Sequence, residues 1–294
     1  MTGRRGRSTA PRGAALFLLP AGVLWGGFLL LPLALILVLS LLDWNLSRAP
    51  APVFSGLGNY RRLLADPEML GALGRTLLFT LESVVLQLAL GLGIALLFVR
   101  ESRVMGLVRA LFMAPMMLAP IFAAMVWRLL YSDDFGLLRY ALVLLGVEDP
   151  PSWLGDPALA LHAVVLVNIW QWTAFVVLFL LAALQSIPAE LYEAARIDGA
   201  GSWRRFRSIT LPLLAPALVA VALFRAVDAV KVLDIVFVLT AGGPGTSTQT
   251  LSFLVYRTGL GFFDLGYASA QALMVLLIIL LLVLALLGLD RSRR

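Results

Sequence analysis

The sequence predicts an all-α integral membrane protein with six transmembrane helices. Two observations carry this prediction: 61% of the 294 residues are hydrophobic while only 14% are charged, and the apolar residues gather in six long runs. A soluble domain of this size could not bury so much apolar surface, so we expect the bilayer to be its solvent. A helix of about 20 residues crosses the roughly 30 Å of hydrocarbon and satisfies its own backbone groups there.

The six runs lie at 14–42, 76–99, 107–131, 159–185, 213–239 and 267–289. A basic tail at 1–13 precedes the first run, which extends well beyond the apolar region of a cleaved signal and is expected to stay in the membrane. Residues 43–75 are expected to form an outer loop, with a short interfacial helix in "NYRRLLADPEMLGALG". Pro115 and Pro120 predict a kink in the third run, which is either a packing irregularity or a flexing element beside a pathway.

The distribution of arginines predicts the orientation in the membrane. Six spans place both chain ends on one side, and that side carries Arg4, Arg5, Arg7, Arg12, Arg100, Arg103, Arg109, Arg196, Arg204, Arg205, Arg207, Arg291, Arg293 and Arg294. The opposite loops carry only Arg48, Arg61, Arg62, Arg75, Arg139 and Arg257. Basic loops favour the cytoplasm, so we expect both termini there. The net charge of +6 is therefore a topology signal, and we expect no nucleic-acid partner.

Residues 186–212 form a charged, glycine-broken segment between the fourth and fifth runs. Pro188 suits a first helical turn, and Glu190 and Glu193 lie near the positive end of that helix. "DGAG" predicts a turn, after which Ser202 can cap a second short helix. We expect a helix–turn–helix that protrudes on the cytoplasmic side, although composition alone would also fit a loop whose arginines meet anionic lipid.

Ionisable residues inside the runs are costly in lipid and are therefore candidates for function. The fifth run carries Arg225, Asp228, Lys231 and Asp234 at i,i+3 steps. These residues either neutralise one another along the helix or line a solute path. Because an i,i+3 repeat drifts around a helix, we do not expect all four to face one cavity.

The fourth run contains Asn168, Trp170, Gln171 and Trp172. Amides can exchange hydrogen bonds with hydroxyl groups, and indoles offer flat faces to sugar rings, but hydrogen bonding between helices is an equal explanation. The candidate pathway residues are thus Asn168, Trp170, Gln171, Trp172, Asp228, Lys231 and Asp234, with Glu82 and Gln87 of the second run as further polar candidates. His162 is the only histidine and cysteine is absent, so we expect neither a metal site nor a cofactor.

The spacing within 186–212 resembles the EAA loop of ABC-importer permeases. Glu193-Ala194-Ala195 is followed after three residues by Gly199, and after nine more by Ile209-Thr210-Leu211-Pro212. "PMMLAPIFAAMVWRLLYSDDFGLLRY" and "VLTAGGPGTSTQTLSFLVYRTGLGFFDLGYASA" also resemble carbohydrate ABC permeases, and the resemblance extends from residue 43 to the end of the sixth run. The additional first run and the outer loop resemble the subunit related to maltose and glycerol-phosphate importers.

This resemblance implies a type I ABC importer permease fold in the bacterial cytoplasmic membrane, with a five-helix core at 76–289 and a cytoplasmic tail at 290–294. It implies an extracytoplasmic solute-binding protein that delivers a carbohydrate, a second homologous permease subunit and two ATP-binding subunits. It further implies that docking on an ATP-binding subunit involves Glu193, Ala194, Ala195, Asp198, Gly199, Ile209, Leu211 and Pro212.

Two other classes of function are weighed against an importer. The only lysine, Lys231, follows Val230, so no phosphate-binding Gly-Lys-Ser/Thr motif is present and ATP would have to be bound by a partner. A secondary transporter would instead use the charged residues of the fifth run, but the EAA spacing and the lack of an internal repeat favour the importer. The sequence offers no nucleophile elbow and no metal-ligand pair, so we expect no enzyme.

Overall fold

The structure, a computed structural model, describes residues 12–48, 51–99 and 102–291 and is mostly helical. Its elements are α1 (Arg12–Ser40), β1 (Leu42–Asp43), β2 (Val53–Phe54), α2 (Gly58–Ala65), α3 (Pro67–Phe98), α4 (Arg103–Met117), α5 (Pro120–Leu130), α6 (Leu137–Leu144), α7 (Ala160–Gln185), α8 (Ala189–Ile197), α9 (Ser202–Arg205), the π-helix η1 (Phe206–Thr210), α10 (Leu211–Val230), α11 (Asp234–Leu239), α12 (Leu251–Tyr256), the π-helix η2 (Arg257–Gly261) and α13 (Leu265–Arg291). Most of the predicted 1–13 tail, Arg100 and the end of the 290–294 tail lie outside the described residues.

The described helices confirm the predicted all-α membrane fold. Five of them are long and apolar enough to cross a bilayer, and the bent pair α4–α5 supplies a sixth span if it is counted as one. The boundaries nevertheless differ from the predicted ones at three places.

The second span begins at Pro67 rather than near residue 76. The side chain of Asp66 accepts a hydrogen bond from the backbone N–H of Glu68 at 2.9 Å, and Pro67 occupies the first turn, where its missing N–H has no cost. The segment "PEMLGALG", expected in an interfacial helix, therefore belongs to the long helix α3, and the separate helix α2 ends at Ala65.

The third span is broken rather than kinked. Helices α4 and α5 meet at an angle of 96°, with Leu118 and Ala119 in extended conformation between them. Because a residue before proline is disfavoured in the helical region, Ala119 ends the helical path and Pro120 starts a new helix.

The fifth span is also broken. Helix α10 ends at Val230 and α11 begins at Asp234. A break frees backbone carbonyls that lipid cannot satisfy. Two hydroxyls supply the missing donors: Thr250 Oγ1 donates to the carbonyl of Val232 at 3.1 Å, and Ser252 Oγ donates to that of Val230 at 3.3 Å.

The chain divides into two compact units. The first comprises Met1–Leu63 and Thr258–Leu273, and within it β1 and β2 pair antiparallel. The side-chain amide of Asn59 donates to the carbonyls of Ser40 and Leu42, and Arg62 forms an ion pair of 2.9 Å with Asp264. These bonds connect the end of α1, the start of α2 and the start of α13 within this unit.

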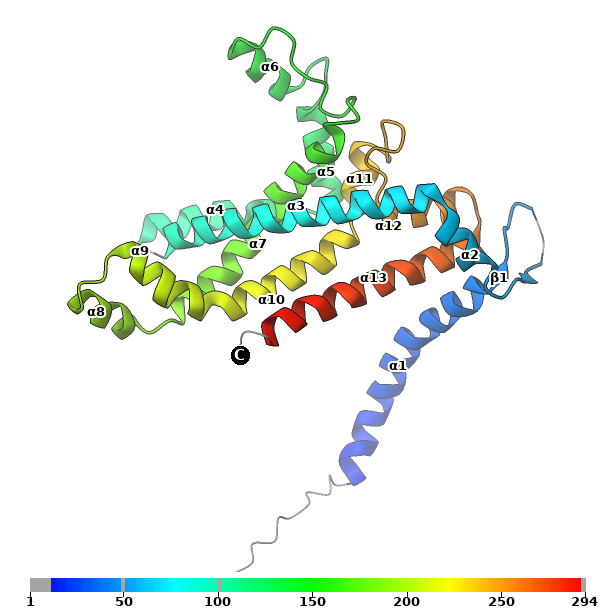
Figure 1. Ribbon diagram of the computed structural model, residues 1–294, viewed down its shortest axis with the longest axis horizontal. Coiled ribbons are helices and arrows are strands. Elements are labelled where there is room, and N and C mark those ends of the chain that lie inside the picture. The colour runs from blue at the N-terminus through cyan, green and yellow to red at the C-terminus, as the bar shows by residue number, and fades with distance from the viewer. Residues whose placement is uncertain (1–11, 49–50, 100–101, 292–294) are drawn as a thin grey trace, which may run out of the picture. The chain divides into compact units, whose positions relative to one another are not determined.

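The second unit, Leu64–Arg257 with Met274–Arg294, contains the core of the bundle. Helix α3 packs along both α7 and α10 (Figure 1). Gly91 of α3 permits this close approach, because a Cβ at that position would lie 2.5 Å from Cγ1 of Val176 on α7. Two apolar clusters fill the core, one around Phe79, Val164 and Ala229 and the other around Ala95, Val176 and Val221.

Candidate functional site

A layer of buried polar side chains separates the two apolar clusters. Each of the three core helices contributes one residue to it: Gln87 from α3, Asn168 from α7 and Arg225 from α10. Gln87 and Arg225 lie, along their helices, between positions that enter the two clusters, and Asn168 lies among the last α7 positions of the first cluster, before Val176 of the second. The polar layer therefore lies inside the membrane-spanning bundle, where every polar group needs a partner.

Arg225 is the centre of this layer and is completely buried. Its Nε donates to Oε1 of Gln87 at 2.9 Å, its Nη1 to Oδ2 of Asp228 at 2.7 Å and its Nη2 to Oδ1 of Asn168 at 3.4 Å. Its guanidinium carbon lies 4.6 Å from the ring centroid of Trp172, in cation–π geometry. Gln87 completes the network by donating to both oxygens of Asn168, at 3.0 and 2.8 Å.

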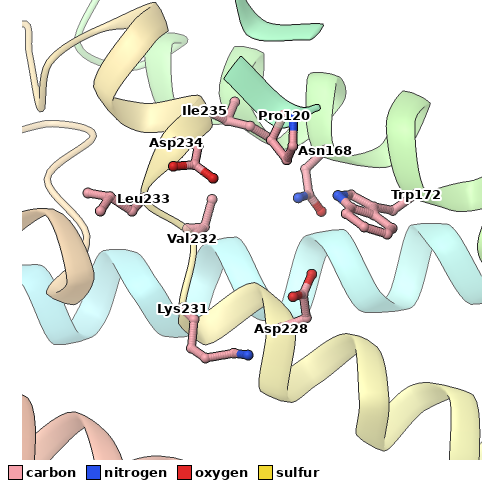
Figure 2. Close-up of a pocket in the computed structure, with 9 residues that line it drawn as sticks. All are labelled: Pro120, Asn168, Trp172, Asp228, Lys231, Val232, Leu233, Asp234 and Ile235. Carbon is pink, nitrogen blue, oxygen red and sulfur yellow. The ribbon is translucent and has the colours of Figure 1, made fainter. Parts of the chain in front are cut away.

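Beside this network is a small pocket of about 90 Å³. It is lined by Pro120, Asn168, Trp172, Asp228, Lys231, Val232, Leu233, Asp234 and Ile235. Figure 2 shows the carboxylate of Asp228 directed toward Asn168 and Trp172, with Asp234 approaching the same space from α11. The pocket thus combines carboxylates, an amide, an ammonium group and an indole ring, which together can bind hydroxyl groups and the apolar face of a ring.

The break in the fifth span changes the predicted geometry of its charges. A continuous helix would have turned the four charged residues to different sides. Because residues 231–233 are not helical, Asp228, Lys231 and Asp234 all line one pocket. Only Arg225 is withdrawn into the core, where it serves as the ion-pair partner of Asp228.

Five of the seven predicted pathway residues line this pocket, and two do not. Trp170 packs its ring against Trp127 at a centroid distance of 5.7 Å, on another side of α7. Gln171 is buried and donates to the backbone carbonyl of Leu118 at 2.8 Å. That carbonyl lies at the α4–α5 bend, so Gln171 stabilises the broken span rather than facing the pocket. Gln87, which was only a further candidate, is part of the network because it pairs with two other helices.

His162 and Glu82 form a separate pair, away from the polar layer. His162 Nδ1 lies 2.9 Å from Oε2 of Glu82, which connects the start of α7 to α3. Among the described residues no group of three histidine, cysteine, aspartate or glutamate side chains could hold a metal ion.

The predicted helix–turn–helix is present as α8, a turn, α9 and η1. Gly199 has a φ of +72°, and Ala200 N donates to the carbonyl of Ala195 at 2.8 Å while Gly199 N donates to that of Arg196 at 3.0 Å. These two bonds are those of a Schellman motif, which requires the left-handed conformation that glycine adopts at low cost. The predicted cap differs: Gly201 rather than Ser202 precedes α9.

One side-chain contact fixes the angle between the two arms of this elbow, residues 189–210. The hydroxyl groups of Tyr192 on α8 and Thr210 at the end of η1 are 3.0 Å apart. The rings of Trp203 and Phe206 stack with their centroids 5.5 Å apart. The elbow is therefore held by its own contacts.

The outer surface of the elbow is available to another protein. Glu193, Ala194, Asp198 and Gly199 are exposed, and Ile197 has 87% of its surface exposed. Within the described chain no ion pair involves Glu193. Of the other predicted coupling residues, Ala195 and Ile209 are half-buried, while Leu211 and Pro212 are exposed at the start of α10.

Comparison with known proteins gives one family and several relatives. Residues 87–294 match the family described as "Binding-protein-dependent transport system inner membrane component". The chain is 40% identical to the trehalose/maltose transport system permease protein MalF of Thermococcus litoralis, over 83% of this chain and 82% of the relative. It is 37% identical to the sulfoquinovosyl glycerol transport system permease protein SmoG of Agrobacterium fabrum, over 89% and 85%. It is 34% identical to the trehalose transport system permease protein SugA of Mycobacterium tuberculosis, over 92% and 87%.

The fold also matches solved structures. A chain of a bacterial alginate ABC transporter, solved in complex with an alginate pentasaccharide-bound periplasmic protein, superposes with a TM-score of 0.83 at 22% identity, covering 98% of each chain. A chain of the MetNI methionine ABC transporter superposes with a TM-score of 0.56 at 19% identity, covering 76% of this chain and 95% of the other. At these identities the matches show a shared fold.

Proposed function

Because the chain belongs to the family of binding-protein-dependent transport system inner membrane components, we propose that it is the permease subunit of an ATP-driven importer for a carbohydrate. Relatives that carry names for trehalose, maltose and sulfoquinovosyl glycerol transport share a polyhydroxylated solute, which supports this class of substrate for the present chain. A solute-binding protein delivers the solute on the outer side of the cytoplasmic membrane. A second permease subunit completes the path, and two ATP-binding subunits supply the energy.

The elbow is the observation that carries this proposal. It presents Glu193 without an internal ion pair, together with the apolar side chain of Ile197, on a rigid turn outside the apolar helices. Such a surface can enter a groove on an ATP-binding subunit, where a cation would pair with Glu193. We infer that the elbow and both termini face the cytoplasm, as the arginine distribution indicates.

The pocket between α7, α10 and α11 is the proposed contribution of this chain to the solute path. Hydroxyl groups of the solute would donate to Asp228 and Asp234 and accept from Lys231, while Trp172 would cover an apolar ring face. This chain catalyses no covalent chemistry in this proposal. The ATP-binding subunits move when they use ATP, and the elbow transmits this movement to the chain. The pocket then opens to one side of the membrane or to the other.

Co-purification and transport test the proposal together. The chain is purified from its native membrane by affinity, and the proteins that accompany it are identified. A second permease and an ATP-binding subunit are expected to accompany it. Vesicles that contain the complex should take up a sugar only when ATP is present on the side that corresponds to the cytoplasm. Recovery of the chain alone, moving solute without ATP and with sensitivity to ionophores, would instead support a secondary transporter.

Two tryptophans of α7 provide a matched pair for the pocket itself. Trp172→Ala removes the ring that lines the pocket, whereas Trp170→Ala removes one that packs against Trp127. Sugar uptake should fall strongly in the first variant and remain close to wild type in the second, with equal amounts of assembled complex. Asp234→Asn provides a second pocket variant, because Asp234 is exposed and its loss leaves the core network intact.

A further inference from the structure

Helix α6 exposes one apolar face, while Leu138 and Leu142 on its other side are half-buried. Leu137, Tyr140, Ala141, Leu144 and Leu145 follow the i, i+3, i+4, i+7, i+8 pattern of a helix face that is usually buried. In this structure all five are exposed, the four large ones with 62 to 80% of their surface, and α6 has no buried residue. Figure 1 shows α6 at the end of a segment that extends away from α3, α7 and α10. We call these five residues the α6 stripe.

The α6 stripe is held in place by specific contacts. Gly136 precedes the helix, and only glycine fits there because a Cβ would lie 2.3 Å from the carbonyl oxygen of Ser132. Gly146 follows with a φ of +88°, and Val147 N donates to the carbonyl of Leu142 at 3.0 Å, which closes the helix with a Schellman motif. Arg139 Nη1 donates to the carbonyl of Pro150 at 3.1 Å and connects the helix to the returning chain. The exposure of the stripe is therefore a feature of an ordered helix.

The charges around the α6 stripe are mostly negative. Exposed carboxylates flank the helix on both sides, at Asp133 and Asp134 before it and at Glu148 and Asp149 after it. Arg139 is the only basic residue between Tyr131 and Pro157, and its guanidinium is bonded to Pro150. A helix that lies on a membrane surface typically has lysine and arginine on its polar side. The acidic rim therefore argues against anionic lipid and favours a protein with a basic rim.

We propose that the α6 stripe docks the solute-binding protein, through an apolar patch that basic residues surround on that protein. This inference rests on the proposed function, because it needs the family's dependence on a binding protein and the orientation that places α6 outside the membrane. Tyr140 is the aromatic anchor of the contact, and Leu144 and Leu145 surround it. The carboxylates of the rim steer the approach of the partner.

The test uses the complete importer in lipid nanodiscs and the solute-binding protein whose addition stimulates its ATPase activity. Leu144→Ala and Tyr140→Ala are compared with Leu97→Ala, which is the matched control because Leu97 on α3 has the same exposed fraction as Leu144, 69%. The dissociation constant of the binding protein should rise about tenfold or more in the two α6 variants and stay unchanged in the control. ATPase activity without the binding protein should be the same in all of them.

A second variant tests the rim. Asp134→Asn, Glu148→Gln and Asp149→Asn are combined, leaving Asp133 because its carboxylate accepts from Ser152 at 2.5 Å. The association rate should fall and lose most of its dependence on salt concentration, while the dissociation rate changes little. A photo-crosslinker at position 144 should attach to the binding protein.

Three results would overturn the inference while leaving the proposed function intact. These are equal affinity of the binding protein for wild type and both α6 variants, crosslinks from position 144 to lipid alone, and loss of the second permease from the purified α6 variants. If wild type itself binds no solute-binding protein and recruits no ATP-binding subunit, the proposed function fails instead.

Discussion

Nη1 of Arg225 lies 2.7 Å from Oδ2 of Asp228, and the two side chains have opposite surroundings. Arg225 is completely buried between three helices, whereas 37% of the side chain of Asp228 is exposed toward the pocket. The same carboxylate therefore neutralises a buried cation and lines the proposed solute path. Asp228 thus has a structural role in the core, and its exposed part is available for the solute contact that we propose.

Asp228→Asn should destabilise the bundle, because it leaves the charge of Arg225 buried without a counter-ion. Removing one partner of a fully buried ion pair typically costs about 3–5 kcal/mol, and the cost here should be smaller because solvent reaches Asp228. The double variant Arg225→Gln/Asp228→Asn removes both charges and should recover much of that stability. Thermal unfolding of the purified complex compares wild type with the two variants, and a double variant no more stable than Asp228→Asn alone would contradict the pairing. Sugar uptake should stay low in both, since each lacks the carboxylate.

Gly199→Val should weaken docking of the ATP-binding subunit without preventing membrane insertion. Gly199 has a φ of +72°, a left-handed conformation that costs an ordinary residue roughly 1–2 kcal/mol. The cost should be higher for valine, because its side chain is branched at Cβ. Gly201→Val is the matched control, because Gly201 has a φ of −65° and open space around its Cβ. Pull-down of the ATP-binding subunit compares the two. Equal docking of both variants would show that the turn does not position the elbow.

Gly91→Val should force α3 and α7 apart. Its Cβ would lie 2.5 Å from Cγ1 of Val176, and overpacking of this kind typically costs about 1–3 kcal/mol. Gly93→Val, two positions along the same helix, meets nothing within 4 Å and serves as the control. The melting temperature in detergent should fall in the first variant only. Val176→Ala should partly restore a Gly91→Ala variant, since it removes Cγ1 of Val176, the atom that the new methyl group would meet at 2.5 Å.

Gln171→Leu should affect the α4–α5 bend rather than solute recognition. Nε2 of Gln171 donates to the carbonyl of Leu118 at 2.8 Å, and leucine would leave that part-buried carbonyl without its donor. A fully buried unsatisfied group costs about 1–3 kcal/mol, so stability should drop by the lower part of this range or less. The relative uptake of different sugars should stay as in wild type, whereas it should change in Asp234→Asn. A changed preference in Gln171→Leu would place this residue in the solute path after all.

Much of the fold follows from local properties of the sequence. Long apolar runs must become helices in lipid, so the spans could be predicted without tertiary information. The turn at Gly199 could be predicted because glycine after a short amphipathic helix favours a left-handed cap. The start of α3 was missed, although Asp66 and Pro67 form a local signal, because the apolar run itself begins later.

The sequence by itself therefore determined the membrane class, the position of the elbow and the identity of the polar residues inside the spans, all of which depend on composition or on neighbours in the chain. Tertiary structure decided which of these polar residues meet. Asp228, Lys231 and Asp234 line one pocket only because the helix breaks after Val230, and that break persists because Thr250 and Ser252, on a distant segment, satisfy the freed carbonyls. Gln87 and Arg225 form a hydrogen bond although they are 138 positions apart in the sequence. A buried polar atom pairs with whichever partner the packing of the helices brings near. The spacing of residues along one helix carries no information about a partner on another helix.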